Sequence, residues 1–369
     1  CDVREYGRGV RYADRKTQRA RISRPLRIVG GGRSEMPATL KDIAKRTNLS
    51  LGTVSNYING KKIKEKNRVL IERAIRELDY SVNQLARGLK TNRSASVGII
   101  MPTLDDPYAA KIASQLTSIF RANDYAVLVC ESASAENEAE VVRFMVQKQV
   151  EGVISFPVAE DAAVYRPLDE KKIPYILIDR ALKGAPCDVF LLNNREISRS
   201  AVRLAISRGH RKIGILAGEK GFLSADERVA GYTDALREEG IPVRQEYILR
   251  SKQNDQDGAI AGAAELTGLP DRPTAVFATN YFFTLGMVVA CSERGLRLGR
   301  EMHLIGFDDI MLNELIRPKL TIVAQPMREY AEKSAALLLG VMRGEFESPK
   351  KTHICEGYIT EGETLGYLG

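Results

Sequence analysis

Residues 39–60 read TLKDIAKRTNLSLGTVSNYING, and this stretch decides the fold of the N-terminal part of the chain. Thr39 and Asp42 stand three residues apart, at the spacing of a helix-capping box. Ser50 can cap a second helix a few residues after the first one ends. The pattern predicts two short helices joined by a short turn.

The predicted second helix has two faces of different character. Its apolar residues follow the i, i+3, i+4 spacing of a buried face: Val54, Tyr57 and Ile58. Its other side is small and polar: Leu51, Gly52, Ser55, Asn56 and Asn59. A third helix shows helical apolar spacing as well: Ile71, Ala74, Ile75 and Leu78. Three short helices with a polar second helix are typical of a helix-turn-helix domain, in which that helix enters the major groove of DNA.

The distribution of charge agrees with DNA binding. Residues 36–96 contain 13 Lys and Arg against 5 Asp and Glu, a net charge of +8. Residues 97–369 contain 32 against 38, a net charge of −6. The basic excess therefore lies where phosphate contacts are expected.

Four segments resemble the lac repressor (LacI/GalR) family of bacterial transcription regulators. They are Leu40–Ala44, Leu49–Asn56, Leu78–Asn83 and Ala86–Leu89, and the resemblance continues through almost all of 39–369. It departs at Asn56, where the family usually has Arg. The resemblance implies a hinge helix at 84–90 whose Leu89 wedges into the minor groove.

From the helix pattern and this resemblance we predict binding to a near-palindromic double-stranded DNA operator, by a homodimer. The expected DNA contacts are Thr39, Ser50, Leu51, Gly52, Thr53, Ser55, Asn56, Asn59, Asn83, Ala86, Leu89 and Lys90. Asn is suited to a bidentate contact with adenine, whereas Arg more often reads guanine.

The remaining composition excludes several classes of protein. No run of about 18 apolar residues exists and no secretory signal is seen, so we expect a cytoplasmic protein without a membrane span. The five cysteines form no Cys-x-x-Cys and the three histidines lie far apart, which predicts reduced cysteines, no metal and no cofactor. Residues 1–35 are basic and poor in apolar residues, so we expect a disordered or non-native extension; a DNA-binding arm is the alternative.

Beyond residue 96, short apolar strands and helices alternate. This rhythm predicts an α/β core with parallel sheets covered by helices, and its length favours two lobes. The predicted domains are a helix-turn-helix domain at 36–83, a hinge and linker at 84–96, and the core at 97–369. The resemblance implies a periplasmic-binding-protein-like core. By that analogy, lobe one spans about 97–190 plus 322–350, and lobe two spans about 191–321 plus 351–369.

Polar residues follow several predicted strands, where ligands bind in sheets of this kind. Hydroxyl-rich ligands need planar polar groups and an apolar or aromatic face. The candidate effector-binding residues are Tyr108, Asp179, Arg228, Asn280, Phe282 and Asp308; Asp106 and Gln325 also follow strands. We expect a small-molecule effector, a sugar or sugar acid.

Other functions were weighed against a carbohydrate-operon repressor. Paired carboxylates at Asp105/Asp106 and Asp308/Asp309 favour a hydrolase, but no nucleophile–base motif accompanies them, so we expect no enzyme. A sugar-binding transport receptor would have the same core without the helices at 39–90. A global regulator that docks a protein corepressor is compatible with the family resemblance.

Overall fold

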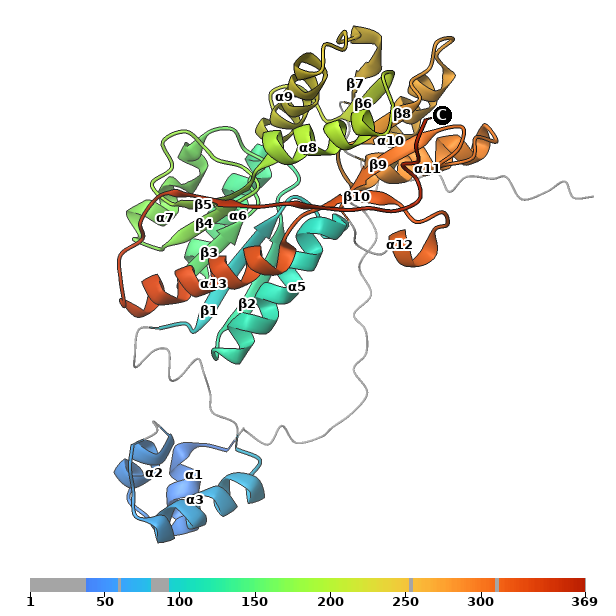
Figure 1. The fold of residues 1–369 in the computed structure, drawn as a ribbon. Helices are drawn as coiled ribbons and strands as arrows, with labels where there is room; N and C mark the ends of the chain where they lie inside the picture. Colours follow the sequence, from blue (N-terminus) through green and yellow to red (C-terminus); the bar gives the residue numbers. More distant parts are fainter. Residues whose placement is uncertain (1–37, 59–60, 81–92, 252–254, 309–311, 369) are drawn as a thin grey trace, which may run out of the picture. The chain divides into compact units, whose positions relative to one another are not determined.

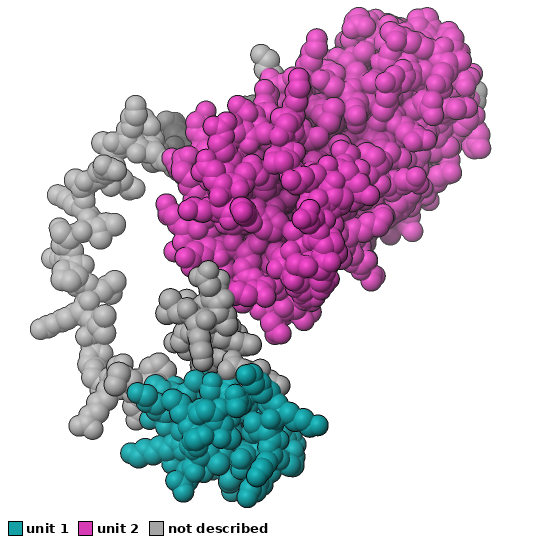
Figure 2. Space-filling model, turned by 90° about the vertical axis from the view of Figure 1, so that its left-hand side faces the viewer, with its two compact units in different colours: residues 1–82 teal, residues 83–369 magenta. Residues whose placement is uncertain are grey.

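The computed structural model describes residues 38–58, 61–80, 93–251, 255–308 and 312–368. The chain divides into two compact units, residues 1–82 and residues 83–369 (Figure 2). The predicted hinge at 84–90 and the extension at 1–35 lie outside the described residues. Each unit is treated below by itself.

The first unit is a three-helix domain, as the apolar spacing predicts. Its helices are α1 (Leu40–Thr47), α2 (Leu51–Ile58) and α3 (Glu65–Glu77). Each helix contributes one or two residues to the buried centre: Ile43, Val54, Ile71 and Ala74. Removing these side chains from water is the main force that holds such short helices together, because isolated helices of this length are unstable.

Local hydrogen bonds set where these helices begin. The Asp42 carboxylate accepts hydrogen bonds from the Thr39 backbone N–H at 2.8 Å and from the Thr39 hydroxyl at 2.7 Å. The Thr53 backbone N–H donates to the Ser50 hydroxyl at 3.2 Å. Both contacts satisfy groups at helix starts that would otherwise lack partners, so the predicted starts of α1 and α2 are confirmed.

Within its described residues, the second unit contains two six-stranded sheets (Figure 1). The first has the strand order β11-β5-β4-β3-β1-β2 and the second β12-β10-β9-β8-β6-β7. All pairs are parallel except β10 with β12. The first sheet comprises β1 (Ser96–Met101), β2 (Ala126–Glu131), β3 (Gly152–Ser155), β4 (Tyr175–Ile178), β5 (Asp188–Leu192) and β11 (Thr352–Cys355). The second comprises β6 (Ile213–Ala217), β7 (Ile248–Arg250), β8 (Ala275–Ala278), β9 (His303–Phe307), β10 (Thr321–Ala324) and β12 (Tyr358–Thr360).

Helices cover both faces of each sheet, and each sheet with its helices is one lobe (Figure 1). In lobe one, α5 (Pro107–Ala122) and α13 (Met327–Arg343) pack on one face, and α6 (Ala135–Gln147), η1 (Ala162–Tyr165) and α7 (Arg166–Glu170) on the other. In lobe two, α8 (Asn194–Ser207) and α9 (Leu223–Glu238) pack opposite α10 (Gln256–Gly268) and α11 (Tyr281–Glu293). The short α12 (Leu312–Leu315) and η2 (Gln245–Tyr247) complete this lobe. The strands are therefore buried on both sides, and the α/β prediction is confirmed.

Two predicted boundaries in this unit are wrong. The expected second crossing at 321/322 would place β10 in lobe one, but β10 pairs with β9 of lobe two, and the chain crosses after it. The expected third crossing at 350/351 would place β11 in lobe two, but β11 pairs with β5 of lobe one. Strand pairing decides both points, and for β11 it joins residues more than 160 positions apart, which local patterns do not reveal.

The segment 161–172, between β3 and β4, does not form one continuous helix. A 3-10 turn, η1, is followed by α7, with Pro167 in the first turn of α7. Proline has no N–H to donate, so it fits the first turn of a new helix and interrupts a longer one.

In the part of the chain that the structure describes, every helix is too short or too polar to cross a membrane.

Candidate functional site

The first candidate site is the outward face of α2. Val54 is fully buried, whereas Leu51, Gly52 and Asn56 are exposed and Ser55 is half-buried. Leu51 exposes 45% of its surface. Apart from Leu51, the outward face of α2 therefore carries small or polar side chains.

The inward face of α2 is anchored by more than apolar contacts. The Tyr57 hydroxyl donates a 3.0 Å hydrogen bond to Glu72 on α3. Glu72 also accepts a hydrogen bond from Arg68 on the same helix. One carboxylate therefore binds side chains from both α2 and α3. The orientation of α2 in the domain is therefore fixed by its buried side. Asn59 and the four predicted contacts from Asn83 to Lys90 lie outside the described residues.

The second candidate site is a cavity of about 140 Å³ between the lobes. All six predicted effector-binding residues line it: Tyr108, Asp179, Arg228, Asn280, Phe282 and Asp308. Asp106, Ser224, Tyr281 and Gln325 complete the lining. The structure thus brings together residues more than 200 positions apart, near the carboxyl ends of strands from both sheets. Their role in effector binding stays a prediction.

Helix caps position two of the side chains. Asp106 caps α5, where its Oδ1 accepts from the N–H of Tyr108 at 2.9 Å. Asn280 caps α11, where its Oδ1 accepts from the N–H of Phe283 at 2.8 Å. Each cap uses one oxygen and leaves the other end of its side chain available to the cavity.

Two carboxylates sit on strained backbone. Asp179 directly follows β4 and has a φ of 73°, and Asp308 directly follows β9 and has a φ of 64°. Residues other than glycine rarely adopt this left-handed conformation, although Asp and Asn tolerate it best. Such strain is common where a fold directs a functional side chain, and here it aims both carboxylates at one cavity.

The Arg228 side chain is held in place by other residues of the protein. Its Nε donates to Asn194 Oδ1 at 2.8 Å, and one terminal nitrogen donates to the Thr279 carbonyl at 2.6 Å. Its guanidinium carbon lies 4.0 Å from the centre of the Phe307 ring. These contacts fix the planar group by hydrogen bonds and by a cation–π interaction.

The electrostatics of the cavity centre on Asp308. Burial raises the pKa of the Asp308 carboxyl to about 7, while Arg228 and the hydrogen bond from Gln325 oppose the rise. The negative charges of Asp106 and Asp179 raise the pKa of Asp308 further. Burial also raises the pKa of Asp106, against its hydrogen bonds with the Tyr108 and Ala109 N–H groups. Three carboxylates thus line the cavity with one positive side chain, Arg228, to compensate their charge.

Buried oxygens without partners mark the same region. Among the described residues, the hydroxyls of Tyr108 and Tyr330 and the Oε1 of Gln325 are buried and accept or donate no hydrogen bond. The charges of Asp179, Asp308 and Arg228 all act on Tyr330, so this hydroxyl lies near the cavity. Leaving such groups unsatisfied costs free energy, which a ligand with matching groups would recover.

One contact outside the cavity joins the two lobes directly. The Arg180 guanidinium carbon lies 4.2 Å from the ring centre of Phe222, which directly precedes α9 in lobe two. Arg180 also donates to the Val158 carbonyl at 2.9 Å within lobe one. Phe222 therefore contacts lobe one and is not among the residues that line the cavity.

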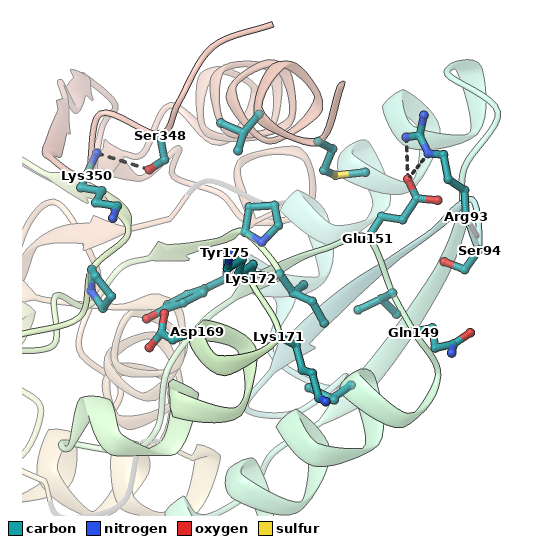
Figure 3. Close-up of a pocket in the computed structure, with 17 residues that line it drawn as sticks. Arg93, Ser94, Gln149, Glu151, Asp169, Lys171, Lys172, Tyr175, Ser348 and Lys350 are labelled. Atoms are coloured by element: carbon teal, nitrogen blue, oxygen red, sulfur yellow. Dashed lines mark hydrogen bonds and ion pairs between the residues drawn. The ribbon is translucent and has the colours of Figure 1, made fainter. Parts of the chain in front are cut away.

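A larger cavity of about 910 Å³ lies at the other end of the strands of the first sheet, away from the inter-lobe cavity (Figure 3). It is lined by lobe one alone, near the amino ends of the strands, and Arg93 at its border is paired with Glu151 at 2.6 Å. Its lining includes Lys171, Lys172 and Lys350. Ligands of parallel sheets bind at the carboxyl ends of strands, so the smaller cavity is the better candidate despite its size.

Four lining residues were not among the six predicted ones. Asp106 and Gln325 follow strands, which is the pattern that was used to choose candidates. Neighbouring residues fit the same pattern, so it did not single these two out. Ser224 and Tyr281 lie in the first turns of α9 and α11, where sequence patterns indicate only helix starts. Among the described residues, no group of three His, Cys, Asp or Glu side chains could hold a metal.

Comparison with known proteins agrees with this architecture. Residues 39–83 match the model of bacterial regulatory proteins of the lacI family, and residues 202–365 match a periplasmic binding protein-like domain. A probable HTH-type transcriptional regulator, EndR of Paenibacillus polymyxa, is 30% identical over 310 residues, which cover 82% of this chain and 90% of the relative.

Two solved structures show the same fold. The lac repressor dimer bound to operator and the anti-inducer ONPF aligns with a TM-score of 0.79 at 23% identity, over 89% of this chain and 99% of that chain. A LacI family regulator from Enterococcus faecium with bound ribose aligns with a TM-score of 0.67 at 23% identity, over 74% and 100%. The chain belongs to the lacI family of bacterial regulatory proteins, which regulate transcription and are not enzymes.

Proposed function

We propose that this protein is a cytoplasmic repressor that binds a near-palindromic operator as a homodimer and responds to a sugar-like effector between its lobes. The observation that carries the proposal is the 140 Å³ cavity, in which side chains from both lobes converge around unsatisfied buried oxygens. A ligand that touches both lobes can change their relative position, and DNA affinity can respond to that change.

The DNA-binding side of the proposal is the exposed face of α2. Ser50, Thr53, Ser55 and Asn56 lie on or beside it, and the operator-bound lac repressor has the same overall fold. Asn56 would read a base edge, and Asn59 would lie one turn further along. We also propose that Leu89 enters the minor groove, with Asn83, Ala86 and Lys90 beside it.

The effector side rests on the chemistry of the cavity. Asp179, Asp308 and Asn280 present planar groups that pair with neighbouring hydroxyls, and Tyr108 and Phe282 present aromatic surface. The ribose complex of a regulator with this fold supports a sugar-sized ligand. A volume of 140 Å³ is about that of five water molecules in the liquid, which favours a single ring.

A thermal-shift screen of sugars, sugar acids, amino sugars and purines tests the proposal. We expect a stabilising compound that also changes operator affinity by about 5–150-fold in a gel shift. The direction of that change distinguishes an inducer from a corepressor. Asp308→Asn should weaken binding of the compound, and Asp105→Asn, which removes an exposed carboxylate outside the cavity, should not. Equal binding to the Asp308→Asn protein would place the effector elsewhere.

A further inference from the structure

The charged groups that line the inter-lobe cavity are unequal in number. Asp106, Asp179 and Asp308 face a single guanidinium, that of Arg228, so the formal charge of the lining is −2 when every carboxyl is ionised. The three carboxylates are close enough to influence one another, because the charges of Asp106 and Asp179 both act on Asp308. The cavity therefore holds more negative charge than its own residues compensate.

The guanidinium group of Arg228 already makes several contacts within the protein. Arg228 uses its Nε on Asn194, a terminal nitrogen on Thr279, and its face on Phe307. Arg180, the next cation along the chain after β4, is directed to Val158 and Phe222 and does not line the cavity. An anionic ligand would thus meet three carboxylates and only the remaining edge of Arg228.

The hydrogen-bonding groups of the cavity include several acceptors without a donor. The Asp179 side chain makes no hydrogen bond or ion pair with the described part of the chain, and Gln325 Oε1 is buried without a donor. Within the described residues, Asp106 and Asp308 each have one carboxylate oxygen beyond the one that accepts from Tyr108 or Gln325. A complementary ligand supplies donors, and a charged donor satisfies a buried carboxylate better than a neutral one.

We propose, on the premise that this cavity is the effector site, that its ligand is a single-ring polyol bearing a protonated amine, such as an amino sugar. The amine would lie among Asp106, Asp179 and Asp308, and the hydroxyls would reach Asn280 and the free edge of Arg228. The proposal excludes sugar acids and phosphosugars, which would add negative charge to a site that already has an excess.

A pair of achiral probes tests the charge without knowledge of the sugar. Tris(hydroxymethyl)aminomethane is a compact polyol cation, and pentaerythritol replaces its ammonium group with a hydroxymethyl group. Calorimetric titration of the full chain at pH 7.5 in phosphate buffer should give at least tenfold tighter binding of the amine. Asp308→Asn and Asp179→Asn should each reduce that preference at least threefold, because each removes one carboxylate. Asp105→Asn should leave it unchanged.

Sugars extend the test to larger ligands. Glucosamine is compared with glucose, and galactosamine with galactose, and in each pair that binds we expect the amine to bind more tightly. Equal or tighter binding of the neutral member in either test overturns the charge inference, while Asp308-dependent binding of that neutral compound keeps the proposed effector site. If neither amines nor neutral polyols bind, the inference and the effector site both fail.

Discussion

Gln325 donates its side-chain amide to the Asp308 carboxylate at 2.9 Å, joining the loops that follow β10 and β9 at the cavity. Both side chains are buried, and among the described residues Gln325 is the side chain that donates to the Asp308 carboxylate. It leaves Gln325 Oε1 without a partner. The pair is therefore arranged to receive a ligand, because one oxygen on each residue stays open to the site.

Replacing Asp308 with Asn should stabilise the protein in a pH-dependent way. Burial raises the pKa of Asp308 from 3.8 to about 7, so the folded state binds this proton more tightly than the unfolded chain. Stability is therefore lost as pH rises from about 4 to about 7, and Asn, which does not ionise, avoids the loss. The gain in unfolding free energy should be larger at pH 8 than at pH 5 by about 2–3 kcal/mol.

Urea unfolding of the parent and Asp308→Asn proteins at both pH values measures this difference. Asn keeps the acceptor for Gln325 and tolerates a φ of 64°, so the substitution adds little strain. A difference between the two proteins that is the same at pH 5 and pH 8 would contradict the buried, titrating carboxyl.

Arg228→Lys should separate charge from geometry in effector binding. Lysine keeps the positive charge but cannot serve Asn194 and Thr279 together while stacking on Phe307. We expect effector affinity to fall by about tenfold or more, which corresponds to about 1.4 kcal/mol, with operator affinity within twofold of the parent. Arg250→Lys, at a surface pair with Asp226, is the control. Unchanged effector affinity in calorimetry would remove Arg228 from the site.

The contact between Arg180 and Phe222 should couple the two lobes. A double-mutant cycle with Arg180→Gln and Phe222→Leu isolates the pair, and thermal unfolding should give a coupling free energy of about 0.5–1 kcal/mol. Gln can still donate to the Val158 carbonyl, so the cycle reports mainly on the ring contact. Additive effects of the two substitutions would show that the lobes are not held together here.

Asn56→Ala tests base reading by α2. Asn56 is exposed on the face opposite Val54, and loss of a bidentate base contact should cost about 1–3 kcal/mol on the specific operator. Binding to random DNA should change little. Asn67→Ala on α3 removes the same side chain from another helix. Fluorescence anisotropy on both DNAs decides the point, since equal losses on both would make Asn56 a general surface contact.

Leu89→Ala tests the hinge proposal. A wedge residue trades unstacking energy for contacts with bent DNA, so its loss should remove most operator affinity. Effector binding should stay intact, because the cavity residues are elsewhere in the chain. A gel shift with unchanged operator affinity would leave the segment as a plain linker.

Much of this architecture could be predicted from the sequence, because it depends on near neighbours along the chain. The spacing of Val54, Tyr57 and Ile58 defines the buried side of α2, and the caps at Thr39 and Ser50 mark helix starts within a few residues. Polar residues after apolar strands identified Asp179, Asn280 and Asp308 in the cavity lining, because parallel strands align their carboxyl ends.

Tertiary structure decided what depends on residues far apart. It placed β11 beside β5 and β10 beside β9, because strand pairing is a long-range choice that apolar runs do not encode. It turned Arg180 toward Phe222 and away from the cavity, and it brought Asp106, Asp179 and Asp308 around one Arg228. The charge of the cavity follows from that packing, since burial and mutual distance, and not residue type alone, determine how carboxylates ionise.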